Sequence, residues 1–396
     1  MSKSFPKSHD VPRGFTLVEL MVAMVLTLIL LGMAFNIFDK LNNAADLAGT
    51  MADVNENLRA GENMIARDLS TAGANIPLGG FPLPSGGTPC KPIPVPLPAW
   101  LPAQVFNPAC GNNMNVITPG SGFGPTSGSG GTKIPTDSVT LITVNPTSQL
   151  NEFQLSSISP ITTTPGAYCC FPAGTTSVTI TVNPGTNGGN LTAAGSSQVV
   201  PGQLIMLSNA NTSVLLAVST VGATTITCTT GDAANDPLGL NQFPLSANSP
   251  TAGTVAQLQT TAAPAANFYP ATYAYQINMT TYYLDNASRA PIWMLMKQVG
   301  TGAPMTGAPP TVPSQPPQPV AMGINVLQFA YSLSPPAVPT DPTRTFVAPY
   351  TPNTIRKVNL WLTAMADHPN RKSGLYYTNS MGTSVTAQNL AYYNQY

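Results

Sequence analysis

A nearly unbroken apolar segment close to the N-terminus, residues 15–38, constrains this chain more than any other feature. As a helix it would be roughly 36 Å long at ~1.5 Å per residue, which is enough to cross the ~30 Å hydrocarbon core of a bilayer. Glu19 is the one ionisable residue within it. Because a carboxylate in hydrocarbon is costly and usually functional, we take Glu19 as the first candidate functional residue.

The residues before this segment predict its orientation. Lys3, Lys7 and Arg13 face only one acidic residue, Asp10, in residues 1–14. The excess of basic residues predicts a cytoplasmic N-terminus and an exported remainder. A secretory signal peptide has its small-residue cleavage site after the apolar segment, whereas here the small residue, Gly14, precedes it. We therefore expect a single-pass inner-membrane precursor.

The sequence GFTLVE at residues 14–19 resembles the class III signal of type IV prepilins. The resemblance implies that residues 1–14 are a leader, that prepilin peptidase cuts after Gly14, and that the new N-terminal Phe15 is methylated. It also implies that Glu19 pairs with the N-terminal amine of a neighbouring subunit. Such a pair would neutralise the carboxylate where an unpaired charge is strongly disfavoured. The alternative is a plain membrane anchor with an incidental glutamate.

The apolar segment is expected to continue as one helix over residues 15–73, with 15–38 in the membrane. No proline interrupts it, and Gly73 is the expected stop. Two helices broken near Gly49 or Gly61 are the alternative. Residues 66–73 resemble the end of this helix in PilW-like minor pilins. Beyond the membrane, apolar residues recur at the spacing of one helical stripe: Leu47, Met51, Val54, Leu58, Ile65 and Leu69.

Proline and glycine dominate residues 74–135, which include the sequence KPIPVPLP at 91–98. Alternating prolines forbid a helix, so we expect a long surface loop; a recognition peptide for a proline-binding domain is the alternative. Short β-branched segments then define a first β region, 136–230, a loop, 231–270, and a C-terminal β region, 271–396. The expected strands are 138–144, 177–182, 203–208, 213–218, 224–228, 273–281, 291–299, 324–331 and 355–362.

These elements predict an α+β fold in which the long N-terminal helix packs on an antiparallel β-sheet head, as in type IV pilins. We expect one sheet to cover the helix. The hairpin at 284–293 and the strands at 323–331 and 355–358 again resemble PilW-like minor pilins. That family closes on a strand with an arginine-asparagine ending, whereas this chain ends in AYYNQY.

Five cysteines, Cys90, Cys110, Cys169, Cys170 and Cys228, lie in the part expected to be exported, where disulfides are permitted. Their odd number leaves at least one unpaired within a monomer. We expect Cys90 to pair with Cys110 and so to close the proline-rich loop. The next pairing that we expect joins Cys228 to Cys169 or Cys170.

Composition and motifs argue against several functions. Basic and acidic residues number 15 each, and charged residues make up 8% of the chain, so we expect no nucleic-acid partner. No haem, zinc or hydrolase motif is present, and we expect no cofactor, metal site or enzymatic activity. Asp367 and His368 are adjacent in an expected turn. Asp232, Asn235 and Asp236 could supply oxygens for calcium, but their spacing matches no EF-hand.

The sequence thus predicts a minor, PilW-like pilin that is processed by prepilin peptidase and incorporated into a type IV pilus with other pilins. We expect it near the tip, where it would initiate assembly and support adhesion or twitching motility, in company with a tip adhesin. Three alternatives stay open: a type II secretion pseudopilin, a large main pilus subunit, and a surface adhesin that uses a pilin anchor.

Overall fold

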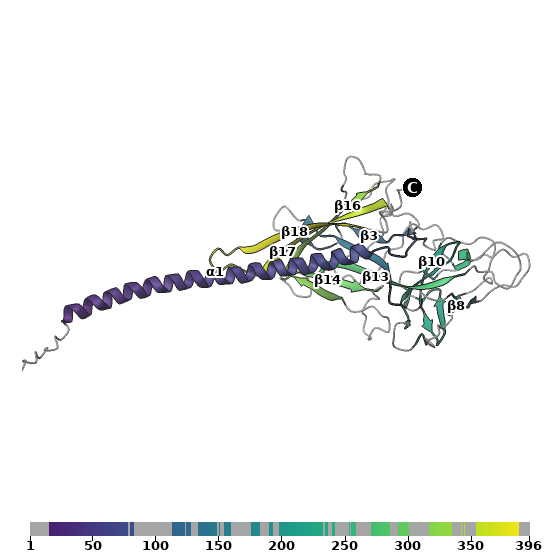
Figure 1. Ribbon diagram of the computed structural model, residues 1–396, viewed down its shortest axis with the longest axis horizontal. Coiled ribbons are helices and arrows are strands. Elements are labelled where there is room, and N and C mark those ends of the chain that lie inside the picture. Colours follow the sequence, from purple (N-terminus) through teal and green to yellow (C-terminus); the bar gives the residue numbers. More distant parts are fainter. Residues whose placement is uncertain are drawn as a thin grey trace, which may run out of the picture.

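A computed structural model describes residues 16–77, 80–82, 113–122, 124–127, 134–148, 150, 154–159, 176–182, 190–192, 198–232, 234–236, 240–241, 253, 255–258, 271–285, 292–300, 317–334, 342, 344 and 354–387. Its dominant element is α1 (Leu17–Thr71), one continuous helix of 55 residues. The single predicted helix is confirmed, with no break at Gly49 or Gly61. Gly73 follows with φ +79°, and its amide donates to the carbonyl of Ile142 at 3.0 Å. Figure 1 shows α1 projecting from one end of the head.

Strands form the rest of the described head, and neighbouring strands in each sheet run antiparallel. The expected strands are present, and nine others among the described residues are additional: β1 to β5 within the segment expected to be a loop, and β7, β11, β15 and β18. In chain order the strands are β1 (Phe81–Pro82), β2 (Asn113–Met114), β3 (Ile117–Gly120), β4 (Thr126–Ser127), β5 (Ile134–Pro135), β6 (Ser138–Val144), β7 (Ser157–Ser159), β8 (Ser177–Thr181), β9 (Leu204–Ser208), β10 (Ser213–Ala217), β11 (Thr220–Val221), β12 (Thr225–Thr229), β13 (Tyr273–Asp285), β14 (Met294–Val299), β15 (Gln318–Met322), β16 (Ile324–Leu333), β17 (Ile355–Pro369) and β18 (Tyr376–Thr386).

The strands are divided among several sheets, and the expectation of one sheet was wrong. The described residues form a seven-stranded sheet around β13, a four-stranded sheet of order β11-β12-β8-β7, a three-stranded sheet of order β16-β17-β18, and two short strand pairs. β6 and β13 are neighbours in the seven-stranded sheet, so the two predicted β regions share it. β3, within the segment expected to be a loop, pairs with β6 in the same sheet.

The upper part of α1 packs on the head through one apolar stripe: Val54, Leu58, Gly61, Ile65 and Leu69 are all buried. They join strands β6, β13, β16 and β17 in a first cluster of buried apolar side chains, the proximal core. Met51, which the pattern included, is 37% exposed. Gly61 belongs to the stripe because a Cβ there would lie 3.0 Å from the Leu295 side chain. The helix backbone therefore approaches the sheet most closely at a glycine.

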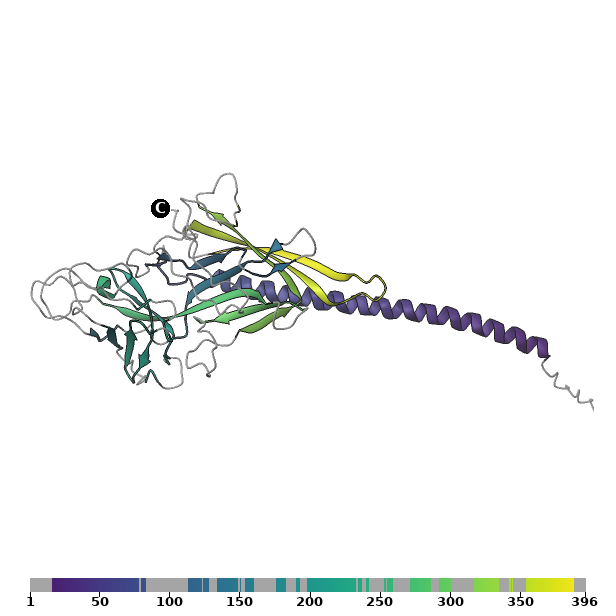
Figure 2. The ribbon, with the colours of Figure 1, turned by 180° about the vertical axis from the view of Figure 1, so that it is seen from behind.

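A second cluster, the distal core, lies beyond the C-terminal end of α1. It is built from β7, β8, β12 and the short 3-10 helix η3 (Val255–Leu258). Figures 1 and 2 show β8 and β10 at the end of the molecule opposite the free part of α1. We call the four-stranded sheet with η3 the distal lobe. The molecule is thus elongated along the direction of α1.

The hairpin of β9 and β10 separates the two cores. Leu204 and Met206 of β9 face the proximal core, and Ile205 and Leu207 face the distal core. β10 alternates in the same way, so both faces of the hairpin are buried. Strands that are buried on both faces have apolar residues in succession rather than in alternation, and the sequence LIML at 204–207 fits this.

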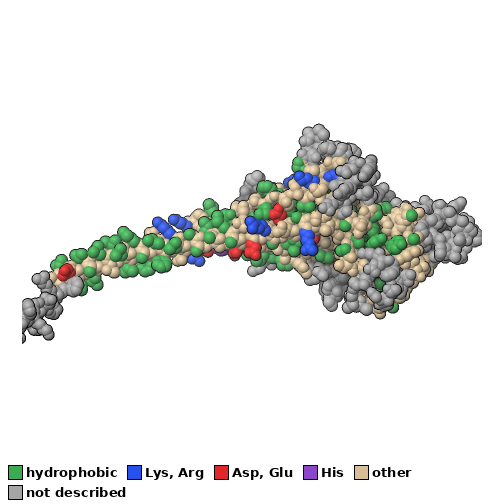
Figure 3. Space-filling model, in the orientation of Figure 1, with side chains coloured by type: hydrophobic (Ala, Val, Ile, Leu, Met, Phe, Trp, Pro, Cys, Tyr) green, Lys and Arg blue, Asp and Glu red, His purple; other side chains and the backbone are tan. Residues whose placement is uncertain are grey.

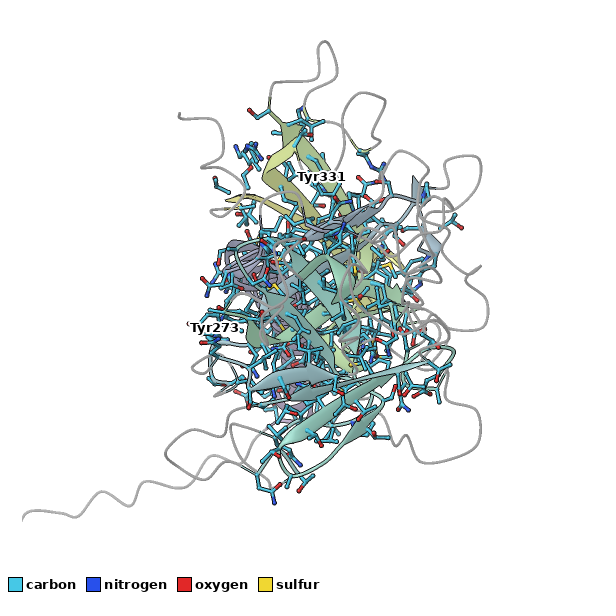
Figure 4. The ribbon with its side chains drawn as sticks, turned by 90° about the vertical axis from the view of Figure 1, so that its right-hand side faces the viewer. Tyr273 and Tyr331 are labelled. Carbon is cyan, nitrogen blue, oxygen red and sulfur yellow. The ribbon has the colours of Figure 1, made fainter. Side chains whose placement is uncertain are left out.

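β13, like β9 and β10, takes part in both cores. Its first residues, Tyr273–Ile277, pair with β9, and its later residues pair with β6 and β14. Ala274 faces the distal core, whereas Tyr282 lies in the proximal core. Figure 4 labels Tyr273 at the side of the head and Tyr331 higher up on β16. Tyr273 is 36% exposed and Tyr331 is fully buried.

Candidate functional site

The N-terminal end of α1 is closed by Thr16 and Glu19. Thr16 is the N-cap, and its hydroxyl oxygen accepts a hydrogen bond from the Glu19 amide at 3.2 Å. In return, the Thr16 amide and hydroxyl both donate to Oε2 of Glu19 at 3.2 Å. This reciprocal capping box satisfies amides that would otherwise lack partners at a helix start. The predicted assembly residue therefore also fixes the first turn, and its side chain is exposed and turned toward the chain that precedes the helix.

Sequence reasoning missed this capping box, although its signature, Thr-x-x-Glu before an apolar segment, is present at residues 16–19. Gly14 and Phe15, the predicted processing residues, lie outside the described residues. Glu19 is three positions into the helix, next to the residues that the predicted cleavage would turn into a new N-terminus. A carboxylate at this position also interacts favourably with the positive end of the helix dipole.

An apolar band covers α1 from Leu17 to Leu41. Every large apolar side chain in it is exposed, as in Leu17 at 76% and Phe35 at 72%. Figure 3 shows apolar atoms around the visible side of this half of the helix, with few charges. The helix is long and apolar enough to cross a membrane, and its most apolar stretch is not buried within the protein. A helix that is apolar all round needs lipid or other subunits around it.

Above the band, a polar contact fixes α1 to the seven-stranded sheet. Oδ2 of Asp68 accepts hydrogen bonds from the Tyr282 hydroxyl at 2.6 Å and from Nζ of Lys297 at 2.7 Å. Burial, together with the Asp68 hydrogen bond and charge, raises the pKa of Tyr282 well above its usual range. The pair of Asp68 and Lys297 is less than one quarter exposed. This contact sets the rotation of α1 relative to the sheet.

The hairpin of β17 and β18 lies along α1 farther toward the membrane band. Nδ2 of Asn379 on β18 donates to Oδ1 of Asn55 on α1 at 2.6 Å. Nε2 of His368 lies 3.8 Å from Oδ1 of Asp46, and its Nδ1 contacts Asp367. Asp367 and His368 belong to strand β17 rather than to the turn that the sequence predicted. Their contacts place them at the helix surface, where they position the hairpin.

Cys228 is the one expected disulfide residue that the structure describes. It is fully buried in the distal core and is a free thiol, so the expected bond to Cys169 or Cys170 is absent. Burial raises the pKa of this thiol, and the charge of Asp236 adds to the rise. The inward-facing position on β12 makes Cys228 a small apolar packing residue. Cys90, Cys110, Cys169 and Cys170 lie outside the described residues.

The three residues considered for calcium make hydrogen bonds within residues 232–241. Asp236 accepts hydrogen bonds from the Leu240 amide at 2.9 Å and the Asn241 amide at 2.7 Å. Oδ2 of Asp232 accepts from Nδ2 of Asn235 at 2.8 Å. Burial acts to raise the pKa of Asp232, but hydrogen bonds led by that of Asn235 outweigh it and lower the pKa. Within the described part of the chain, no group of three acidic, histidine or cysteine residues could hold a metal ion.

A buried carboxylate that sequence reasoning missed, Asp137, joins three segments of the head. It accepts hydrogen bonds from the amides of Gly122 and Phe329, both at 2.8 Å, and from Nη2 of Arg344 at 2.6 Å. Asp137 is fully buried, and the ion pair with Arg344 satisfies its charge. Breaking such a pair leaves a buried charge uncompensated. Because these partners are distant in the sequence, no local sequence pattern predicts that Asp137 is buried and paired.

A model of the prokaryotic N-terminal methylation motif matches residues 12–35. The match spans Gly14, Phe15, the capping box and most of the apolar band. This is a prepilin-type N-terminus. No curated protein and no solved structure matches the chain.

The motif and the geometry agree on a type IV pilin-like protein. The motif implies processing by prepilin peptidase and assembly with other pilins. The exposed helix and the antiparallel head give the α+β architecture of a helix packed on sheets. An inner-membrane precursor that later joins a filament fits both observations, because the same band can be surrounded first by lipid and later by other helices.

Proposed function

We propose that this protein is a minor, PilW-like type IV pilin, placed near the pilus tip with its N-terminus initially in the cytoplasm. It acts as a structural subunit rather than as an enzyme: it initiates assembly and supports adhesion or motility. Glu19 receives the methylated N-terminal amine of a neighbouring Phe15. Cys90 and Cys110 close the proline-rich segment by a disulfide.

The distal lobe is the observation that carries the tip position. In a filament whose helices lie side by side, the next subunit toward the tip occupies the space beyond each head in the direction of the helix axis. Here that direction is filled by the distal lobe, which continues the line of α1 (Figures 1 and 2). A terminal position avoids the clash, whereas a main subunit would repeat it at every copy. The size of the head therefore favours a subunit present in few copies.

The first experiment tests processing. Mass spectrometry of the mature N-terminus is expected to find methylated Phe15, with residues 1–14 removed. A mature protein that begins at Met1 would contradict the pilin assignment itself.

The second experiment tests the position and the role. Immunogold labelling of an epitope fused to the C-terminus is expected to mark filament ends, and the same epitope on the most abundant pilin is the control that marks the shaft. Deletion of the gene is expected to reduce the number of filaments seen by electron microscopy. Label along the whole shaft would support a main subunit. Normal filament numbers with lost attachment would support an adhesin, and lost protein secretion would support a pseudopilin.

A further inference from the structure

The turn between β17 and β18, residues 370–375, ends the hairpin that lies along α1; we call it the membrane-proximal turn. Its backbone is closed by hydrogen bonds from the Asn370 amide to the Leu375 carbonyl at 2.9 Å and from the Gly374 amide to the Asn370 carbonyl at 2.8 Å. Oδ1 of Asn370 accepts from the amides of Lys372 and Ser373 at 3.0 and 3.1 Å. Gly374 has φ +68°, a conformation that favours glycine. The turn is therefore a defined structure that presents its side chains outward.

The turn lies close to the membrane boundary of α1. Figures 1 and 2 show the hairpin running beside the helix toward its N-terminal half. His368, two residues before the turn, is 3.8 Å from Asp46 of α1. The apolar segment ends at Phe38, ~12 Å before Asp46 along the helix. The two residues from His368 to Asn370 carry the hairpin ~7 Å back toward the membrane, and the headgroup layer extends roughly 5–7 Å beyond the hydrocarbon on each side. The turn thus lies at headgroup height.

The side chains at this height are those that suit a bilayer interface. Leu375 is 71% exposed and Tyr376 is 45% exposed, and neither belongs to a described hydrophobic cluster of the head. Arg371 and Lys372 are exposed beside them. Tyrosine is enriched at headgroup level, and long basic side chains bind phosphate oxygens while their stems lie on apolar surface. The combination matches an interface with phospholipid.

The nearby charges leave the basic pair available. Among the residues that the structure describes, no carboxylate lies within ion-pair distance of Arg371 or Lys372. Asp46 and Asp367 both contact His368, on the head side of the turn. The two basic side chains are therefore not neutralised by a described carboxylate.

We propose that the membrane-proximal turn rests on phospholipid headgroups of the membrane that α1 spans. Leu375 enters the boundary between headgroups and acyl chains, and Arg371 and Lys372 bind lipid phosphates. Together with α1, the turn gives the precursor a second point of membrane contact and so fixes the tilt of the head. The proposal goes beyond the pilin role and requires only that α1 spans a membrane.

Photo-crosslinking in membranes tests the contact on the full-length chain. Benzoylphenylalanine replaces Leu375 in one variant, Leu30 within the apolar band in a second, and Thr386 at the far end of β18 in a third. The host produces no other pilins. The Leu30 variant shows that lipid adducts are detected, and the Thr386 variant gives the background for an exposed residue of the same strand. We expect at least about tenfold more phospholipid adduct at position 375 than at 386 by mass spectrometry, since an interfacial contact of more than about 1.4 kcal/mol changes occupancy tenfold.

Two outcomes would overturn the proposal: adduct at 375 no higher than at 386, or adducts at 375 that join only protein. The second outcome would assign the turn to contact with another copy of the chain.

A charge variant tests the basic pair separately. The chain with benzoylphenylalanine at 375 is reconstituted in nanodiscs of phosphatidylglycerol, with and without Arg371→Gln and Lys372→Gln. We expect the lipid adduct to fall roughly fivefold for each charge removed. Lys357→Gln, at the opposite end of the hairpin, is the matched control and is expected to leave the yield unchanged. Since all three side chains are on the surface, unaltered circular dichroism checks the fold. An equal yield with and without the basic pair would refute its binding to phosphate.

Discussion

The two halves of α1 are parts of one helix with opposite surroundings. From Leu17 to Asn42 every residue is exposed, including the largest apolar side chains. From Asn43 to Thr71 the buried residues, Val54, Leu58, Gly61, Ile65 and Leu69, lie on one face, which packs against the head, whereas Met51 and Met64 are exposed. The lower half is apolar all round and the upper half is amphipathic. Helix propensity is similar in both halves, so the distribution of apolar residues around the helix decides the surroundings of each half. An all-round apolar surface suits lipid or other subunits, and a single apolar stripe suits the head.

The comparison also separates two kinds of residue. Apolar side chains on the stripe of the upper half stabilise this subunit, whereas the large apolar side chains of the lower half are exposed. Substitutions in the upper half should therefore change the unfolding of the head, and substitutions in the lower half should change membrane insertion or assembly. Substitutions at Glu19, Ile65, Gly61 and Asp68 distinguish these two outcomes.

The largest effect is expected at Glu19. Glu19→Val removes the charge and the capping box, and we expect its recovery in sheared filaments to fall by about tenfold or more, because each 1.4 kcal/mol changes an equilibrium about tenfold. Head unfolding and membrane insertion should be unaltered. Glu19→Gln is the matched control variant, since glutamine preserves the capping box but lacks the charge. If the glutamine variant assembles normally, the cap rather than the ion pair between subunits is what assembly requires.

The next effect is expected at Ile65, which is fully buried on the stripe. Ile65→Ala should lower the free energy of unfolding by about 2–5 kcal/mol, since it leaves a cavity between helix and sheet. Urea denaturation of the full chain in detergent micelles, followed by tryptophan fluorescence, measures this. Leu30→Ala in the lower half is the control, and a comparable loss there would show that the two halves are not distinct.

Substitutions at two glycines of α1 should change the free energy of unfolding in opposite directions. Gly61→Val places side-chain atoms against Leu295, and a cost of about 1–3 kcal/mol is expected from overpacking. A Cβ at Gly49 has no atom within 4 Å, so Gly49→Ala should stabilise the helix by about 0.5–1 kcal/mol. The same urea experiment compares the two. Equal signs for both substitutions would mean that the close approach at Gly61 does not exist in solution.

The last effect is expected at the polar contact of Asp68. Asp68→Asn weakens two charge-assisted hydrogen bonds, and we expect about 1–2 kcal/mol of destabilisation at neutral pH. Asp53→Asn, on an exposed position of the same helix, should change nothing measurable. The pKa of Tyr282 is raised in the folded state by burial and then by Asp68. The stability linked to the neutral phenol is thus present below pH 10 and is lost as the pH rises beyond it. Asp68→Asn removes the part of the rise that comes from the carboxylate, so in this variant the loss should stop at a lower pH, as measured by urea denaturation from pH 9 upward.

Local patterns predicted the elements whose causes are local. The α1 stripe follows helical spacing, and β6 and β9 are rich in β-branched or other apolar residues. β18 escaped prediction because its sequence, YYTNSMGTSVT, is polar on the outer face and only half-buried on the inner face. Its strand conformation depends on pairing with β17, and pairing of that kind is not visible in composition.

The candidate site was predictable to a similar degree. Glu19 is marked by its position in an apolar segment, and Gly61 fills the gap of seven between Leu58 and Ile65 in the stripe. The division into two cores is a property of non-local pairing, and so is the burial of Asp137. A β3 strand within the proline-rich segment likewise requires its partner β6. Sequence patterns state which face is apolar, but not which distant strand will cover it.

Because β13 belongs to both cores, it is also the mechanical link of the subunit. The amide of Gly73, just past the end of α1, bonds to β6, β6 pairs with one end of β13, and β9 of the distal hairpin pairs with the other. A pull between filament and distal lobe would run along this strand and load its hydrogen bonds in shear. Bonds loaded in this way share the force and break together. This connectivity gives tension a path of backbone hydrogen bonds from the β9–β10 hairpin to the helix.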